Sequence, residues 1–411
     1  MLNFFCWYGW IWLIVFILYA LNLTEFSIPL DLRLVVFLAV TIIISILFGY
    51  IYRKELVFKY SKSQKIVIRK TTMILILIGV VIDFIYAKEV PFISLAITGS
   101  SHYKDFKGIP TFHVFLICYS TYFAIKCFYA ALIDKRNRKR YLFYFVIVQG
   151  IYLLNFLRSQ ILFNFFSGGV IFVAYLKSKG RIKFKYYLYV MMTALFTLYA
   201  FGGLGNLRHG YSWNDCSYID RLGLYIRWPS FIPEQFKWAY SYITTPLANL
   251  NYHIINAKPK YDLFSLFLNL LPDAIAKRIY PPGIKSDALL IRMYFNVSTG
   301  YQPAYSAFGF FGMIIYFISI YFISFFGLFL AKKKRNSNNG DIFYAIMCVV
   351  IAYLFFANTL CFAGTSIVLW ISLFSMLLFI FTLRKRKIMH QTAKSKFKMN
   401  CLKSLLQILS M

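Results

Sequence analysis

Long apolar runs recur along the 411-residue chain, separated by short polar segments that contain most of its charges. Several runs reach 17 residues or more, and about 20 helical residues at ~1.5 Å each cross a hydrocarbon layer of ~30 Å. The pattern therefore predicts about ten transmembrane helices. We expect them at residues 4–23, 31–52, 66–87, 111–133, 141–157, 160–176, 186–204, 303–331, 341–358 and 365–383.

The overall composition agrees with this pattern. Hydrophobic residues make up 60% of the chain and aromatic residues 21%, well above the usage of ordinary soluble domains. We therefore expect an all-α fold: a polytopic membrane protein with a large helical loop on its periplasmic side. The spans divide the chain into a seven-helix membrane bundle (1–204), the large loop (205–302), a three-helix bundle (303–383) and a basic cytoplasmic tail (384–411).

The basic residues fall on one side of this arrangement. The segments 53–70, 135–140, 177–185 and 332–335, together with the tail, contain 29 of the 45 lysines and arginines. Short cytoplasmic loops collect such residues, so we expect both termini in the cytoplasm, the loop in the periplasm and a multi-pass protein of a bacterial inner membrane. The net charge of +31 would then attract the protein to anionic membrane lipid. We expect no nucleic-acid partner, because the basic residues are scattered among apolar spans.

The loop 205–302 is where polar chemistry is concentrated. It contains ten basic and six acidic residues, which favours an anionic ligand. We expect helices within it at residues 220–232, 236–256 and 260–280, packed on the membrane face.

Two arginines stand out at the outer ends of the predicted spans. Arg208 follows a glycine-rich stretch, Gly202 to Gly210, that we interpret as a turn whose backbone N–H groups and guanidinium approach phosphate oxygens. Arg158 lies in a tight outer turn between two short spans. The alternative for both is an interfacial side chain that reaches the headgroups, with glycines that cap a helix.

The sequence lacks the common catalytic signatures, including a GxSxG elbow, a Walker phosphate loop and HExxH. Its seven cysteines show no CxxC spacing. We therefore expect no metal and no cofactor.

Three segments resemble the O-antigen polymerases, the oligosaccharide repeat-unit polymerases called Wzy. The resemblance extends over roughly residues 150–312 and the pattern of spans. It rests on Arg158 at the end of a span, on residues 205–208 (GNLR) with 242–251 (YITTPLANLN), and on residues 296–312 (NVSTGYQPAYSAFGFFG). Many relatives have a polar or acidic residue before the Phe-Gly pair of the third segment, where this chain has Ala307.

This resemblance implies a metal-independent membrane glycosyltransferase of lipopolysaccharide biosynthesis. It would transfer a glycan from undecaprenyl pyrophosphate to the non-reducing end of an undecaprenyl-pyrophosphate-linked repeat unit at the periplasmic face. Such a displacement needs cations for the leaving pyrophosphate and a base for the acceptor hydroxyl. Our candidates are Arg158, Arg208 and Arg227 for the pyrophosphate, His209 for the base with Asp215 and Asp220 as alternatives, and Tyr211, Trp213, Trp228 and Tyr301 for sugar stacking.

Two other functions stay open at this point. An O-antigen ligase would use the same donor with a lipid A core as acceptor. A lipid-linked oligosaccharide flippase would be a transporter, and we expect charges along its central spans and short loops throughout, unlike this chain. A protein that regulates chain length is a further candidate partner of a polymerase.

Overall fold

The computed structural model describes residues 3–53, 66, 68–98, 106–180, 183–280, 288–333 and 338–378. Within these ranges the regular secondary structure is helical, and the only strand-like pairing is an isolated bridge between Thr24 and Tyr225. The helices are α1 (Phe4–Ala20), α2 (Leu32–Ile51), α3 (Lys70–Ala87), α4 (Pro91–Thr98), α5 (Phe112–Ile133), α6 (Arg138–Leu154), α7 (Arg158–Ser178), α8 (Phe184–Arg208), α9 (Ser217–Gly223), α10 (Phe236–Asn256), α11 (Leu263–Leu268), α12 (Asp273–Ile279), α13 (Gln302–Lys333), α14 (Asn338–Ala352), a 3₁₀ turn (Tyr353–Phe355) and a final apolar helix (Ala363–Leu378).

Six of these helices are long and apolar enough to cross a membrane: α2, α3, α5, α7, α8 and α13. The expected all-helical fold is thus confirmed, and the apolar helices are compatible with a multi-pass membrane protein. Every range predicted as a span overlaps a helix, including the shorter α1, α6, α14 and Ala363–Leu378. The predicted tail, residues 384–411, lies outside the described residues.

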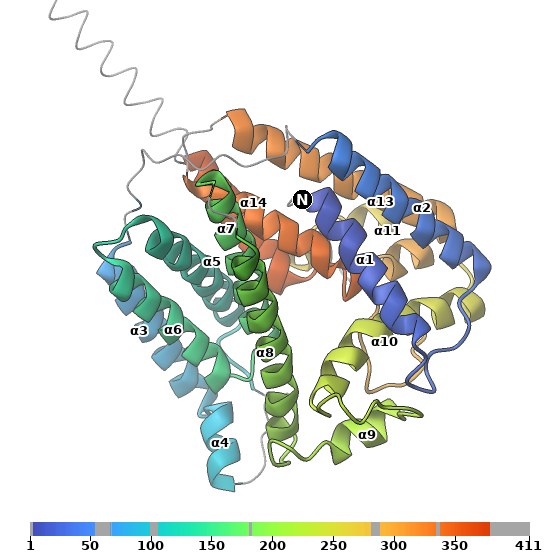
Figure 1. Ribbon diagram of the computed structural model, residues 1–411, viewed down its shortest axis with the longest axis horizontal. Helices are drawn as coiled ribbons and strands as arrows, with labels where there is room; N and C mark the ends of the chain where they lie inside the picture. Colours follow the sequence, from blue (N-terminus) through green and yellow to red (C-terminus); the bar gives the residue numbers. More distant parts are fainter. Residues whose placement is uncertain are drawn as a thin grey trace, which may run out of the picture.

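The helices pack around two hydrophobic cores. The larger core draws buried side chains from α1, α2, α7, α10, α13 and α14, while the smaller one joins α3, α5 and α6. Helix α5 belongs to both, with Tyr122 in the larger core and Phe123 in the smaller. In Figure 1, α3 to α6 lie to the left of α7 and α8, and α1, α2 and α13 lie to the right. Helices α7 and α8 therefore stand at the junction of the two parts.

Helix α13 is interrupted within the third segment of the family resemblance. Gly309 has a φ of +63°, a left-handed conformation that side chains other than glycine rarely adopt. The carbonyls of Ser306 and Ala307 accept hydrogen bonds from the backbone N–H groups of Lys260 and Asp262, each at 2.8 Å. The loop thus satisfies backbone groups that the break removes from the helix ladder.

The loop contains less helix than the sequence predicted. The prediction of 236–256 matches α10. The predicted helix 220–232 is wrong beyond Gly223, where α9 ends and Leu224 takes a left-handed conformation. The predicted helix 260–280 is two short helices, α11 and α12, with Pro272 before the second. A proline removes a backbone donor and collides with the preceding turn, so it favours such an interruption.

Candidate functional site

The junction of α7 and α8 holds a buried arginine. Arg158 is the first residue of α7 and only 4% exposed. Its Nη1 donates a hydrogen bond of 2.7 Å to the carbonyl of Phe201 in the last two turns of α8. The turn before it contains Phe156 at a φ of +53°. The tight turn that the sequence predicted therefore exists, and it directs the guanidinium inward between helices.

Aromatic rings enclose this guanidinium. Its Cζ atom lies 4.3 Å from the ring centre of Phe201, 5.0 Å from that of Trp238 and 5.8 Å from that of Tyr242. A cation within about 6 Å of a ring centre is attracted by the ring quadrupole, which partly replaces the lost hydration of a buried charge. Trp238 and Tyr242 are one turn apart on α10, so one face of the loop helix closes over Arg158.

Glycines on α8 make this approach possible. A Cβ on Gly205 would lie 2.5 Å from Nη1 of Arg158 and 2.7 Å from Cε2 of Trp238, and one on Gly202 would lie 2.0 Å from the carbonyl oxygen of Gln235. We interpreted Gly202 to Gly210 as a turn, but the helix continues through Arg208, and of these glycines only Gly210 has a positive φ, +79°. The helical glycines here serve close packing.

Tyr242 lies between the two arginines that the sequence singled out. Burial raises the pKa of its phenol, but the charges of Arg158 and Arg208 and their hydrogen bonds outweigh this effect, so its net pKa lies below that of an ordinary tyrosine. The ring also stacks on Phe356, with ring centres 5.7 Å apart and planes at 13°. Both guanidinium groups therefore interact with Tyr242, and that of Arg158 lies 5.8 Å from the centre of its ring.

His209 joins this group through Trp238. Its ring stacks on Tyr218, with centres 3.9 Å apart, and lies 5.6 Å from Trp238 at an interplanar angle of 9°. The indole N–H of Trp238 donates to Oδ1 of Asn206 at 2.7 Å, which fixes the ring between Arg158 and His209. We name the group formed by Arg158, Arg208, His209, Trp238 and Tyr242 the arginine cluster.

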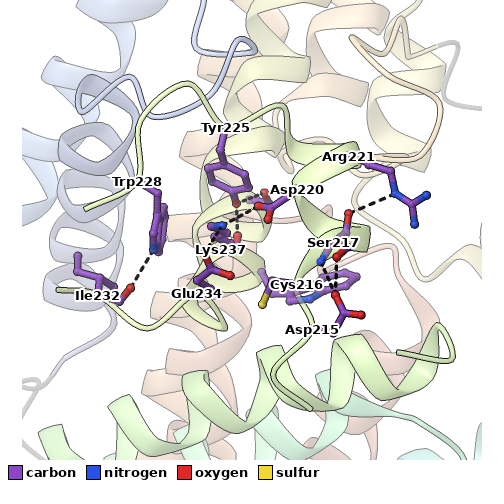
Figure 2. Close-up of polar contacts among 12 residues, drawn as sticks. Asp215, Cys216, Ser217, Asp220, Arg221, Tyr225, Trp228, Ile232, Glu234 and Lys237 are labelled. Carbon is purple, nitrogen blue, oxygen red and sulfur yellow. Dashed lines mark hydrogen bonds and ion pairs between the residues drawn. The ribbon is translucent and has the colours of Figure 1, made fainter. Parts of the chain in front are cut away.

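The two carboxylates proposed as alternative bases have other partners (Figure 2). Asp215 accepts hydrogen bonds from the backbone N–H of Ser217 at 3.0 Å and from its hydroxyl at 2.5 Å, and these bonds lower the pKa of Asp215. Asp220 forms an ion pair of 2.7 Å with Lys237, whose Nζ also lies 3.1 Å from Glu234. These contacts begin α9 and attach it to α10, so we leave both carboxylates out of the proposed site.

Three of the four aromatic residues proposed for sugar stacking lie between α8 and α10. Tyr211 contacts Arg221 through its hydroxyl, Trp213 packs on Gly203, and the Trp228 indole donates to the carbonyl of Ile232 at 3.0 Å.

Two further candidates in the loop 205–302, Tyr301 and Arg227, have other surroundings. Tyr301 is 0% exposed and packs on Trp12 and Phe37 in the larger core. A sugar cannot reach it there, and we drop it from the proposed site. Arg227 is exposed in the segment that pairs with Leu23, and we drop it as well.

Sequence reasoning therefore found three members of the cluster and missed two. Trp238 and Tyr242 have an i, i+4 spacing that places them on one helix face, and Tyr242 opens the second segment of the family resemblance. That spacing was the available signal, but it is hidden among 33 tyrosines.

Comparisons with protein-family models, curated proteins and solved structures found no match to this chain.

Proposed function

We propose that this protein is a surface-polysaccharide polymerase that joins lipid-linked repeat units. The observation that carries the proposal is that Arg158 and Arg208 both interact with Tyr242, where α7 begins and α8 ends. Two guanidinium groups held together at the end of two membrane-length helices suit a pyrophosphate whose polyprenyl chain stays in the hydrocarbon. The resemblance to O-antigen polymerases supports the same reaction.

The proposed topology has ten spans, both termini in the cytoplasm and the loop 205–302 in the periplasm of a bacterial inner membrane. Cys216 is an unsuitable probe of this topology, because it is buried at 2% exposure. Ser230, which is exposed in the loop, is a better position. In a cysteine-free background, Ser230→Cys should react with a membrane-impermeant thiol reagent in intact spheroplasts. Reaction only after lysis would reverse the orientation.

In the proposed reaction, the acceptor hydroxyl oxygen forms a new bond to the anomeric carbon of the donor glycan, and the bond from that carbon to the pyrophosphate oxygen breaks. Arg158 and Arg208 stabilise the negative charge that develops on the leaving pyrophosphate, because preorganised charged donors act most strongly where charge appears in the transition state. Tyr242 is a positioning residue that holds the two guanidinium groups at one place.

His209 receives the acceptor proton in this scheme. Imidazole is the side chain that most often serves as a general base near neutral pH. Stacking on Tyr218 and Trp238 fixes the plane of its ring. His209→Gln should lower the rate about 10²- to 10⁴-fold, whereas Tyr242→Phe, which keeps the ring and removes the hydroxyl, should act mainly by misplacing the arginines.

Deletion of the gene in its bacterium, followed by electrophoresis of lipopolysaccharide, tests the function. A core that carries a single repeat supports a polymerase. A bare core with accumulated lipid-linked polymer would identify a ligase instead, and loss of every repeat from the outer surface would identify a flippase. Complementation with the wild-type gene and with Arg158→Ala then links the phenotype to the cluster.

A further inference from the structure

A second group of cations lies at the opposite end of the α7–α8 pair. A cavity of about 540 Å³ opens between the end of α5, the start of α6, the end of α7 and the start of α8. Three basic side chains, Lys135, Arg138 and Lys179, contribute to its lining. We call this cavity the basic pocket, and it shares no residue with the arginine cluster.

The rest of the lining consists of apolar side chains and two tyrosines, and part of it lies deeper along the helices. Leu142 is four residues inside α6, and Phe172 is six residues before the end of α7, which places them about 6 and 9 Å from those helix ends at ~1.5 Å per residue. Leu176 adds to the same surface. Cations therefore lie at the helix ends, and apolar side chains lie deeper along the helices. A lipid requires this order, because its phosphate lies at the membrane surface and its acyl chains lie below it.

Two of the three cations are held in place by contacts within the protein. The Nε of Arg138 donates a hydrogen bond of 3.0 Å to the carbonyl of Ala131. Nζ of Lys179 contacts the Tyr175 hydroxyl and lies 4.2 Å from the centre of that ring. A guanidinium held through Nε presents its two Nη groups as a fork, which matches the oxygens of a phosphate.

We propose that the basic pocket binds the phosphate headgroup of an anionic phospholipid, with an acyl chain on the surface of Leu142, Phe172 and Leu176. Charge complementarity selects an anionic lipid over a zwitterionic one, and basic pockets between transmembrane helices suit such headgroups. The apolar lining selects a lipid over a free phosphate ion. The proposal is independent of the polymerase function.

The test uses the delipidated full chain in an uncharged detergent, titrated with phosphatidylglycerol and followed by native mass spectrometry. One variant removes the three pocket cations: Lys135→Gln, Arg138→Gln and Lys179→Gln. The matched control removes three exposed cations that do not line the pocket, Lys139→Gln, Lys177→Gln and Lys183→Gln, so that the net charge of the two proteins is equal.

We expect the pocket variant to lose about a hundredfold in affinity and the control less than tenfold, since each lysine or arginine near a phosphate contributes about fivefold. Lys135→Gln alone, at an exposed position, should lose about fivefold and guards against misfolding of the triple variant. Equal losses in the pocket variant and the control would overturn the proposal, because they indicate diffuse attraction. Equal binding of phosphatidylcholine, or of inorganic phosphate, by the wild type would overturn it too.

Discussion

The two ends of the α7–α8 pair use cations in opposite ways. At one end Arg158 is 4% exposed and enclosed by Phe201 and Trp238. At the other end Lys135 and Arg138 are exposed at the mouth of a cavity of about 540 Å³. The first cation is enclosed by protein side chains, whereas the other two present their charge to the surroundings of the helix ends.

A basic residue at a helix end can therefore have one of two roles, which its exposure distinguishes. An exposed lysine reaches water at little cost and suits attraction to a lipid surface. A buried guanidinium loses several kcal/mol of hydration, in order of magnitude, unless its surroundings replace it. A buried guanidinium at a fixed place suits the proposed pyrophosphate ligand better than an exposed cation does.

The largest effect is expected from removing or changing the buried cation, Arg158. Arg158→Ala should lower the rate of polymer formation about 10²-fold or more, because a preorganised donor is lost from the transition state. Arg158→Lys should restore only part of it, since lysine has the charge without the planar fork. Long-chain lipopolysaccharide, normalised to the amount of protein in the membrane, is the measurement.

The matched control for this prediction is Arg227→Ala, which removes an exposed arginine from the loop 205–302. Its chain-length distribution should equal that of the wild type. If Arg158→Lys gives the full distribution as well, Arg158 is only an interfacial cation and the proposed pyrophosphate site is wrong.

A second prediction concerns overpacking around Arg158, caused by adding a methyl group at Gly205. Gly205→Ala places a Cβ 2.5 Å from Nη1 of Arg158, well inside the distance of van der Waals contact, and overpacking of this kind costs about 1–3 kcal/mol. We expect a lower thermal midpoint and shorter polymer. Gly169→Ala is the control, because a Cβ there meets nothing within 4 Å and alanine favours a helix by about 0.5–1 kcal/mol.

The helix positions were predictable because the hydrophobic pattern depends on the membrane, which acts on each segment separately. The same pattern placed Arg158 and Arg208 at the outer ends of predicted spans, and both interact with Tyr242 in the structure. Other features depend on packing between segments far apart in the sequence. Gly205 faces Arg158, 47 positions earlier in the chain, and Tyr301 packs on Trp12. Local sequence contains no sign of either contact.

A third prediction concerns Lys237, a buried cation that forms ion pairs with two carboxylates. Burial lowers the pKa of Lys237, but hydrogen bonds and charge from Asp220 and Glu234 outweigh this and raise it. Its stabilisation is therefore fully present below the pKa of unfolded lysine and is lost as the pH rises through the higher folded value. Lys237→Met should cost about 1–2 kcal/mol at pH 7, measured by thermal unfolding.

The check on this prediction is the pH dependence. The difference in thermal midpoint between wild type and Lys237→Met should shrink only at strongly alkaline pH. A difference that is equally large above the folded pKa would show that lost packing, and not the ion pair with Asp220, accounts for the effect.

The smallest expected effect distinguishes a catalytic carboxylate from a structural one beside the arginine cluster. Hydrogen bonds from Ser217 lower the pKa of Asp215, so its contribution to stability is present above the unfolded pKa and is lost only as the pH falls through the lower folded value. The carboxylate thus stays ionised throughout pH 5–8, and Asp215→Asn keeps an oxygen that can accept the same bonds. Polymer synthesis by Asp215→Asn membranes should remain within about twofold of the wild type at every pH in this range, whereas a lost general base lowers the rate about 10²- to 10⁴-fold.

His209→Gln, assayed in parallel, should show the large loss. If the large loss falls on Asp215→Asn and His209→Gln is active, the proton goes to the exposed carboxylate, and the stacked imidazole is only part of the wall around Arg158.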